Sequence, residues 1–423
     1  MKALLADRIA LLKFNVRHSR MSPVLPFDVL ALIIDIVGEN KDINLLKELA
    51  LVSHSSLQIC RRHLFTTVEL RDGDPRLDVA SSKRGFVKLL KSRLEIVNYI
   101  RKLTYQVSFK NDDDHLLSPI LSKFLPTFSH LNCLTIATSC RDWSALDSSL
   151  TSMFLHLMRL PTINHINLSG FVNFPLSSLT LSVNLLRLDI FCLSHFEYSD
   201  EQGFLKNAQS ETIPKIREFH TSSSSLLTTK LLDAKRQDGQ PAFNFMDLRR
   251  LSMSFIQFED IWNIRYLLQN AESLEKLQLS VSHTQSLAGI LSTSSPTLKV
   301  LDLTVSLYDY PWQSLPVAGL FEELEAMAGH NMLESLSLGV NVNLHVDVYE
   351  TVNFIGSIFQ NVKKVLVKPG WSSLRQVSFK FPLPHWVQRD AELCKTVQSL
   401  PDKYLNHLPK LERIAFDYLA YFD

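Results

Sequence analysis

Few residues of this chain stand at spacings that could do chemistry. The run Asp112-Asp113-Asp114-His115 offers the oxygen ligands that a hard cation such as Ca²⁺ prefers. It lacks the alternating ligands and the glycine of a calcium-binding loop, so a solvated acidic turn is the favoured interpretation. His63, His165 and His220 each stand apart from any recognisable partner pattern. We expect them to be ordinary core or surface histidines.

The cysteines offer neither a disulfide framework nor a zinc site. There are five of them, an odd number, and no C-x-x-C pair occurs. They stand at Cys60, Cys133, Cys140, Cys192 and Cys394. Free thiols of this kind are typical of a reducing compartment, so we expect the protein to be cytoplasmic or nuclear.

Motifs of nucleotide-binding and hydrolytic enzymes are also missing. The chain has 12 glycines, and none falls in G-x-G-x-x-G or G-x-x-x-x-G-K spacing. No G-x-S-x-G turn is present. The sequence therefore predicts no catalytic residue, no metal site and no cofactor, and it favours a function other than that of an enzyme.

Charge and hydropathy narrow the class of partner. Lys and Arg number 44 against 43 Asp and Glu, a net charge of +1, which gives no support for a nucleic-acid surface. The most apolar stretch, Val29 to Val37, is broken by Asp35 and is shorter than the roughly 18 residues that a membrane span needs. We expect neither nucleic acid nor membrane as a partner.

The segment Val24 to Phe65 carries the clearest helical pattern. A first helix is predicted to open at Pro26, where the missing N–H costs nothing, and to end at Gly38. Its inward residues recur at helical spacing and are Leu30, Ile33, Ile34 and Val37. A second helix should start with Asp42 as N-cap, and a third should run from about Ser55 to Leu64. About forty residues are at the lower limit for an independent core, so part of this apolar surface should meet another protein or the next domain.

This pattern resembles the F-box of fungal-type F-box proteins. The residues that carry the likeness are Leu25-Pro26, Asp28-Val29-Leu30, Ile33-Ile34, Leu45-Leu46, Leu49, Leu51-Val52-Ser53 and Arg61-Arg62-His63-Leu64-Phe65. The chain departs from the family at Ser56, where a tryptophan is usual. The resemblance implies that these helices bind a Skp-type adaptor of a cullin ubiquitin ligase, while the rest of the chain binds a protein substrate. The adaptor-binding residues that it implies are Leu25, Pro26, Val29, Leu30, Ile33, Ile34, Leu46 and Leu49.

A plain three-helix cap without a ligase role is the alternative to this interpretation. The two hypotheses differ in the exposure of the surface formed by Leu25-Pro26 and by Leu30, Ile33 and Ile34. A free apolar patch favours an adaptor site, whereas burial against Phe86 and Leu89 favours a cap.

After Phe65 the fragment L-x-x-L-x-L recurs in close variants. The nine copies begin at Ile100, Leu131, Ile163, Leu248, Leu274, Leu298, Leu333, Leu374 and Leu411. Weaker candidates lie near Val183 to Leu188 and Ile216 to Thr221. Each copy alternates as a strand does, and helical spacing returns between copies. The stretch Thr221 to Ser225, rich in serine, is expected to form a surface loop.

These copies resemble a leucine-rich-repeat array, in which stacked units bury faces that none could bury alone. The asparagine or cysteine that the family places after L-x-L is mostly absent, which predicts an irregular array. The predicted fold class is therefore α/β, a small all-α three-helix F-box-like module followed by an irregular leucine-rich-repeat-like solenoid. The predicted domains are a leader helix or tail at 1–21, the F-box-like domain at 22–68 and the solenoid at 69–423. A bundle of unrelated α/β units is the alternative for the last part, and a mitochondrial presequence is the alternative for residues 1–20.

Polar residues between the apolar positions of each copy should line a concave surface. Those chosen as substrate-binding candidates are Arg250, Ser252, Lys276, Gln278, Asp302, Gln376 and Ser378. The sequence thus favours a substrate receptor of an SCF-type ubiquitin ligase with an unknown protein substrate. A ligase-independent scaffold or protein-interaction module is the second hypothesis.

Overall fold

The computed structural model describes most of the chain from Pro26 onward. The described residues are 26–71, 83–107, 123, 127–194, 212–236, 238–255, 259–282, 289–291, 296–307, 319–329, 331–342, 348–383, 395–396, 398–400, 403–404 and 414–422. The predicted leader segment 1–21, Leu25, the Asp112–His115 run and Cys394 lie outside them. None of the helices in these ranges is both long and apolar enough to span a bilayer.

Three short helices open the described chain: α2 (Phe27–Glu39), α3 (Ile43–Ala50) and α4 (His54–Leu64). We call them the α2–α4 cluster. They share a small core of their own, which consists of Ile34, Val37, Leu46, Leu49, Ile59 and Cys60. The predicted N-cap is confirmed, since the Asp42 carboxylate accepts from the Leu45 N–H at 3.2 Å.

The sequence pattern predicted that the first helix ends at Gly38, but the structure shows that it does not. Helix α2 continues to Glu39, and an alanine Cβ at Gly38 would lie 2.2 Å from Cγ of His63 on α4. The ring of His63 packs over Gly38, and its Nε2 lies 2.7 Å from Oδ1 of Asp35. The glycine is therefore needed for the close approach of α4 to α2 and not for a helix stop.

Gly38→Ala is expected to destabilise the α2–α4 cluster by about 1–3 kcal/mol, the usual cost of overpacking. This loss should occur although alanine gains about 1 kcal/mol of helix propensity over glycine. Urea unfolding measures the change. In a His63→Ala background the clash is gone and Gly38→Ala should become neutral or stabilising; equal losses in both backgrounds would contradict the packing account.

The remaining described chain forms one parallel sheet of twelve strands in chain order. The strands are β1 (Thr67–Leu70), β2 (Lys102–Gln106), β3 (Cys133–Asp142), β4 (His165–Val172), β5 (Arg187–Phe191), β6 (Glu218–Ser222), β7 (Arg250–Phe255), β8 (Lys276–Ser282), β9 (Val300–Leu307), β10 (Ser335–Val342), β11 (Gln376–Leu383) and β12 (Ala415–Phe422). The helices between them are α5 (Lys83–Ser92), η2 (Leu94–Tyr99), η4 (Trp143–Ala145), α7 (Ser148–Met158), η5 (Leu176–Leu181), α8 (Ser225–Asp233), α9 (Glu259–Asn270), α10 (Leu320–Met327) and α11 (Val348–Leu366).

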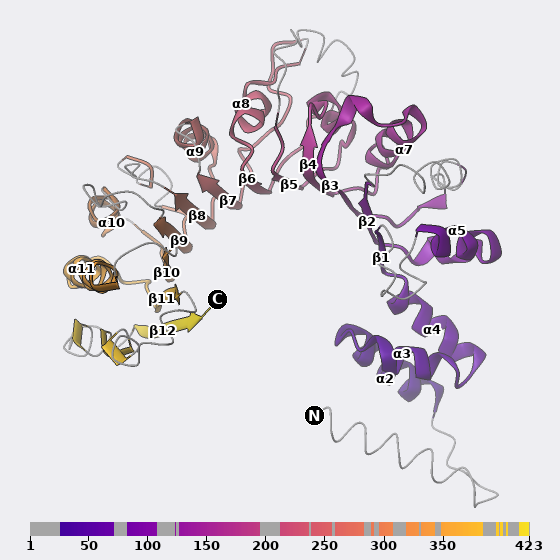
Figure 1. The fold of residues 1–423 in the computed structure, drawn as a ribbon, viewed down its shortest axis with the longest axis horizontal. Helices are drawn as coiled ribbons and strands as arrows, with labels where there is room; N and C mark the ends of the chain where they lie inside the picture. The colour runs from indigo at the N-terminus through magenta and orange to yellow at the C-terminus, as the bar shows by residue number, and fades with distance from the viewer. Residues whose placement is uncertain are drawn as a thin grey trace, which may run out of the picture.

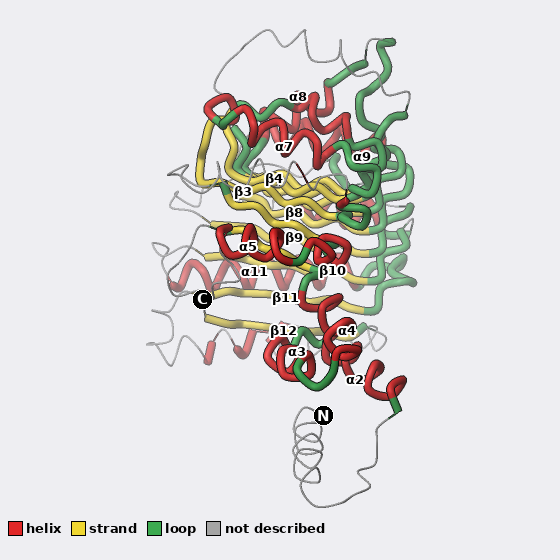
Figure 2. The backbone as a smooth tube through the Cα atoms, turned by 90° about the vertical axis from the view of Figure 1, so that its right-hand side faces the viewer, coloured by secondary structure: helices red, strands yellow, loops and turns green. Residues whose placement is uncertain are grey.

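The sheet bends into an arc with its strands on the inner side and its helices on the outer side (Figure 1). Seen from the side, the strands lie next to one another in a continuous series (Figure 2). The α2–α4 cluster lies beyond β1 at one end of the arc, and β12 lies at the other end. Outward helices and inward strands leave two different faces on the sheet, one covered and one open.

The apolar positions of successive copies align across the sheet and fix its register. One buried row runs from Leu103 through Leu134 and Ile166 to Leu188, and continues in the same slot to the later strands. Apolar residues of the helices pack on these rows in one core. Because side chains alternate along a strand, a slip of one residue would turn this whole set outward, so burial holds the register.

The predicted fold class is wrong. After the three helices of the α2–α4 cluster, the structure has one continuous twelve-stranded, all-parallel sheet that alternates with helices, in place of an irregular leucine-rich-repeat-like solenoid. The sheet already starts at Thr67, where the helical module was expected to end. Its pairing is regular, with a register shift between Ala137 and Arg141. The aligned apolar rows maintain this regularity, so the missing asparagines do not make the array irregular.

The Thr221 to Ser225 segment is also not a surface loop. It joins the end of β6 to the start of α8, and Thr221, Ser224 and Ser225 are buried. The Ser224 hydroxyl accepts from the Leu193 N–H at 2.9 Å and donates to the Ser222 carbonyl at 3.0 Å. Hydroxyl groups that satisfy the backbone in this way let a serine-rich turn stay inside.

Candidate functional site

The first candidate site is an exposed apolar stripe on α2. Val29, Leu32 and Ile36 follow one another at helical spacing, and they are 42, 60 and 44 % exposed. Leu51 and Val52, in the turn before α4, are also exposed. We call Val29, Leu32 and Ile36 the α2 stripe. It lies beside the residues that face the core of the α2–α4 cluster, so α2 is apolar on two sides.

The predicted adaptor-binding residues divide between this surface and the core. Val29 and Pro26 are exposed, and Leu30 and Ile33 are half-buried. The other described candidates are inaccessible core residues: Ile34, Leu46 and Leu49. These three already fill the small core of the free chain, so their direct contact with an adaptor stays a prediction. Leu32 and Ile36 were missed, although their spacing with Val29 in the sequence was the signal.

The second candidate site lies on the open inner face of the sheet. The substrate-binding candidates all lie there, on two neighbouring register rows. Arg250, Lys276 and Gln376 share the first row, and Ser252, Gln278, Asp302 and Ser378 share the second. Strands about 4.8 Å apart bring the side chains of one row into reach of one another.

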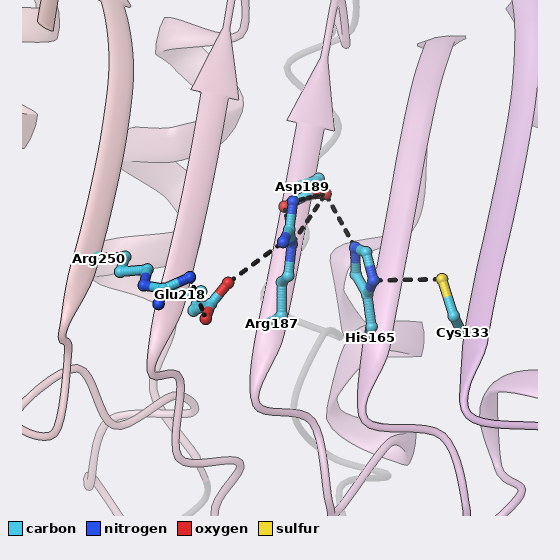
Figure 3. Close-up of polar contacts among 6 residues, drawn as sticks. All are labelled: Cys133, His165, Arg187, Asp189, Glu218 and Arg250. Atoms are coloured by element: carbon cyan, nitrogen blue, oxygen red, sulfur yellow. Dashed lines mark hydrogen bonds and ion pairs between the residues drawn. The ribbon is translucent and has the colours of Figure 1, made fainter. Parts of the chain in front are cut away.

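A chain of polar contacts runs along these rows from β3 to β7 (Figure 3). We call it the inner-face ladder: Cys133, His165, Asp189, Arg187, Glu218 and Arg250. His165 Nδ1 lies 3.2 Å from Cys133 Sγ, and its Nε2 lies 2.8 Å from Asp189 Oδ2. Arg187 donates from Nε to Asp189 Oδ1 at 3.1 Å. Arg187 also donates to Glu218 at 3.2 Å, and Glu218 in turn pairs with Arg250 at 3.3 Å.

Asp189 is the buried centre of the ladder, with its side chain 4 % exposed. Burial by itself raises the pKa of this carboxyl group, but hydrogen bonds from His165 and Arg187 outweigh burial and lower it. For His165, burial acts to lower the pKa, whereas the contacts with Asp189 and Cys133 raise it to about 9. The imidazole is thus a cation at neutral pH and donates from both ring nitrogens.

His220, next to Asp189 on the same register row, behaves differently. Burial lowers its pKa, and the nearby Arg187 lowers it further, against the opposing effect of Asp189. Its Nε2 is buried without a hydrogen-bond partner among the described residues. One carboxylate thus faces two histidines and one arginine, and it pairs with His165 and Arg187.

The His165 pKa predicts how stability depends on pH. The folded state holds the proton up to about pH 9, whereas an unfolded histidine releases it near pH 6.5. The stabilisation is therefore fully present below about pH 6.5 and is lost as the pH rises through about 9. We expect a loss on the order of 1–2 kcal/mol, reduced by the solvent that reaches the ring. Urea unfolding at the two ends of this range measures it, and His165→Gln should flatten the profile. An unchanged profile in that variant would contradict the assignment.

The sequence missed most of the ladder. Only Arg250 was among the predicted site residues. The expectation that His63 and His165 are ordinary core or surface histidines did not include their contacts with Asp35 and Asp189. The L-x-x-L-x-L copies did contain a signal for the ladder, namely a position that they share. Cys133, His165 and Arg250 occupy the same slot in their L-x-x-L-x-L fragments, two residues after the first apolar position. Aligned copies place equal slots side by side on parallel strands.

Within the described ranges, no cluster of three or more His, Cys, Asp or Glu side chains is arranged to hold a metal ion. In the ladder, Cys133 and Asp189 contact opposite nitrogens of the same ring, so their ligand atoms do not converge.

A scan against protein-family models finds no match to this sequence. A search of curated proteins finds no match either. The two sites have the chemistry of contact surfaces, one apolar and one charged.

Proposed function

We propose that this chain is the substrate-binding subunit of an SCF-type cullin ubiquitin ligase. In this proposal the α2 stripe binds a Skp-type adaptor, and the inner face of the sheet binds a protein substrate. The observation that carries it is the uncovered α2 stripe on a helix cluster that has its own core. Such a subunit works in the cytoplasm or the nucleus and holds its substrate while other subunits carry out the transfer.

The contacts between the α2–α4 cluster and the sheet support this assignment. They run through α4 and η2, where Tyr99 donates to Gln58 at 3.1 Å and Arg61 pairs with Glu95 at 3.5 Å. The residues of the α2 stripe remain exposed. A helix that only capped the sheet would turn its apolar surface toward Phe86, which packs instead in the separate core of the sheet. An aligned apolar stripe that remains in water is typical of a protein-binding site.

The inner face suits the second half of the proposal. It presents charged and hydroxyl side chains on a rigid strand surface, as polar protein interfaces do. Arg250 and Lys276 are neighbours in register there, and both are exposed. Preorganised side chains lose little entropy when they bind a partner.

A ligase-independent scaffold is the second candidate, and Ser56 favours it. This residue stands where the F-box family usually has tryptophan, and it is fully buried. Its hydroxyl lies 2.7 Å from that of Ser53, and its N–H donates to the same Ser53 oxygen at 3.1 Å. Ser56 thus supports the start of α4, and the aromatic contact of the family is replaced by a cap.

Co-purification of the full chain with a Skp-type adaptor tests the proposal. Capture at a 1:1 ratio is the expected result. If the folded chain captures no adaptor, the ligase proposal fails and the scaffold candidate remains. Circular dichroism of the same preparation distinguishes a folded chain that does not bind from an unfolded one.

A further inference from the structure

The inner-face ladder ends on a cysteine whose surroundings differ from those of the other described thiols. Cys133 lies in register between Lys102 on β2 and His165 on β4. Its sulfur is 3.2 Å from Nδ1 of His165, whose opposite nitrogen is held by the buried Asp189. A nucleophile, an imidazole within hydrogen-bond reach and a third group that orients the ring form the arrangement of an activated thiol.

We propose that Cys133, His165 and Asp189 form a nucleophilic thiol site that undergoes exchange with small anionic disulfides. One proton is shared across the 3.2 Å contact between the Cys133 sulfur and Nδ1 of His165, so the ring can hold it while the sulfur attacks. The Asp189 carboxylate fixes the ring so that Nδ1 faces the sulfur. This site is independent of adaptor binding and lies at the other end of the ladder from Arg250.

The backbone around Cys133 determines which thiol chemistry is possible. Acyl transfer needs free N–H donors for a developing oxyanion. The N–H groups of Asn132 and Cys133 both donate to the Arg101 carbonyl, at 2.9 and 3.1 Å. They are committed to the sheet, so the site lacks these donors. Disulfide exchange passes negative charge only between sulfur atoms, and it needs no oxyanion site.

In the exchange, Cys133 Sγ attacks one sulfur of the reagent and forms a mixed disulfide. The S–S bond of the reagent breaks, and its other sulfur leaves as a thiolate with the electron pair. The protein thiol is oxidised and the reagent is reduced. The proton shared between Sγ and His165 Nδ1 remains on the ring or passes to the leaving thiolate through water.

Charge and access select the reagent. Lys102 is exposed beside Cys133, and together with the His165 cation it places positive charge on both sides of the sulfur. An anionic reagent is therefore favoured over a cationic one. Cys133 is 8 % exposed, so a small disulfide is a better fit than a macromolecule. Glutathione disulfide, which carries several carboxylates, is the probe we would use.

The other cysteines serve as internal comparisons in the same molecule. Cys140 and Cys192 are free and exposed, and no histidine bonds to either of them within the described chain. Cys60 is buried in the core of the α2–α4 cluster, and burial raises the pKa of its thiol. If exposure alone controlled reactivity, Cys140 and Cys192 would react before Cys133.

The test is the rate of glutathionylation of each cysteine in the folded full chain at neutral pH, followed by peptide mass spectrometry. Cys133 should react at least about tenfold faster than Cys140 and Cys192. It should prefer glutathione disulfide over the cationic disulfide cystamine. His165→Gln should remove the advantage of Cys133 and leave the rates of the other two unchanged.

Asp189→Asn supplies a second variant with nearly the same side-chain volume, in case His165→Gln does not fold. Lys102→Gln should reduce only the preference for the anionic reagent. Lys364→Gln, the same substitution at an exposed position on the distant helix α11, should leave all of these rates unchanged. The proposal is overturned if Cys140 or Cys192 reacts faster than Cys133 in the natural chain. It is equally overturned if the Cys133 rate is the same in a folded His165→Gln or Asp189→Asn chain.

Discussion

Leu32→Asp is expected to abolish capture of a Skp-type adaptor while the chain remains folded. Leu32 is 60 % exposed in the middle of the α2 stripe, so an aspartate there stays in water in the free protein. In the complex the carboxylate would be buried against apolar side chains without a partner. Such a penalty is several kcal/mol, and affinity should fall at least about 100-fold. Isothermal titration with the purified adaptor measures the loss.

Leu226→Asp is the matched control, because Leu226 is also an exposed leucine on a helix, at 39 % exposure on α8. It should leave capture unchanged. Ile34→Asp makes the opposite comparison: Ile34 is fully buried, and its replacement should unfold the α2–α4 cluster itself. Equal capture by the natural chain and Leu32→Asp would contradict a binding role for the α2 stripe. Equal loss in Leu226→Asp would show that the effect is not local.

The positions of most strands could be predicted from the sequence, because burial alone sets the pattern. Leu248 and Leu251, for example, mark the start of β7, and Leu274 and Leu277 mark the start of β8 in the same way. What the pattern cannot give is how many neighbouring copies pair without a break. That number depends on pairing between strands far apart in the sequence. The short strand β1, for example, pairs with β2 although its sequence holds no full L-x-x-L-x-L fragment.

The candidate sites were harder to predict for a related reason. Side chains on the open face do not have to be apolar, so nothing in one copy shows that His165 pairs with a residue 24 positions later. Their contacts appear only when β3, β4 and β5 are placed side by side. On α2, by contrast, helical spacing marks both the core-facing residues and the exposed α2 stripe in the sequence. Spacing alone does not show which of the two sets faces the core. The position of α4 decides that, and the close approach of His63 to Gly38 is one of the contacts between α4 and α2.

Asp189→Ala is expected to be the most destabilising single change on the inner face. The carboxylate accepts from His165 and Arg187, and its removal leaves two cations without their shared partner. Breaking a buried ion pair costs about 3–5 kcal/mol, but Arg187 is 38 % exposed and recovers part of its hydration. We therefore expect a loss of about 2–4 kcal/mol in the free energy of unfolding, measured by urea titration at neutral pH.

Glu218→Ala is the control for this change, because it also removes a carboxylate that bridges two arginines. Glu218 is 26 % exposed and its partners reach water, so its loss should cost about 1 kcal/mol or less. Similar costs for the two variants would mean that burial of Asp189 contributes nothing. In a His165→Ala background, Asp189→Ala should cost less than it does alone, because one stranded cation is absent. That coupling would show that Asp189 and His165 act as one unit, whereas strictly additive losses would show that Arg187 alone accounts for the effect.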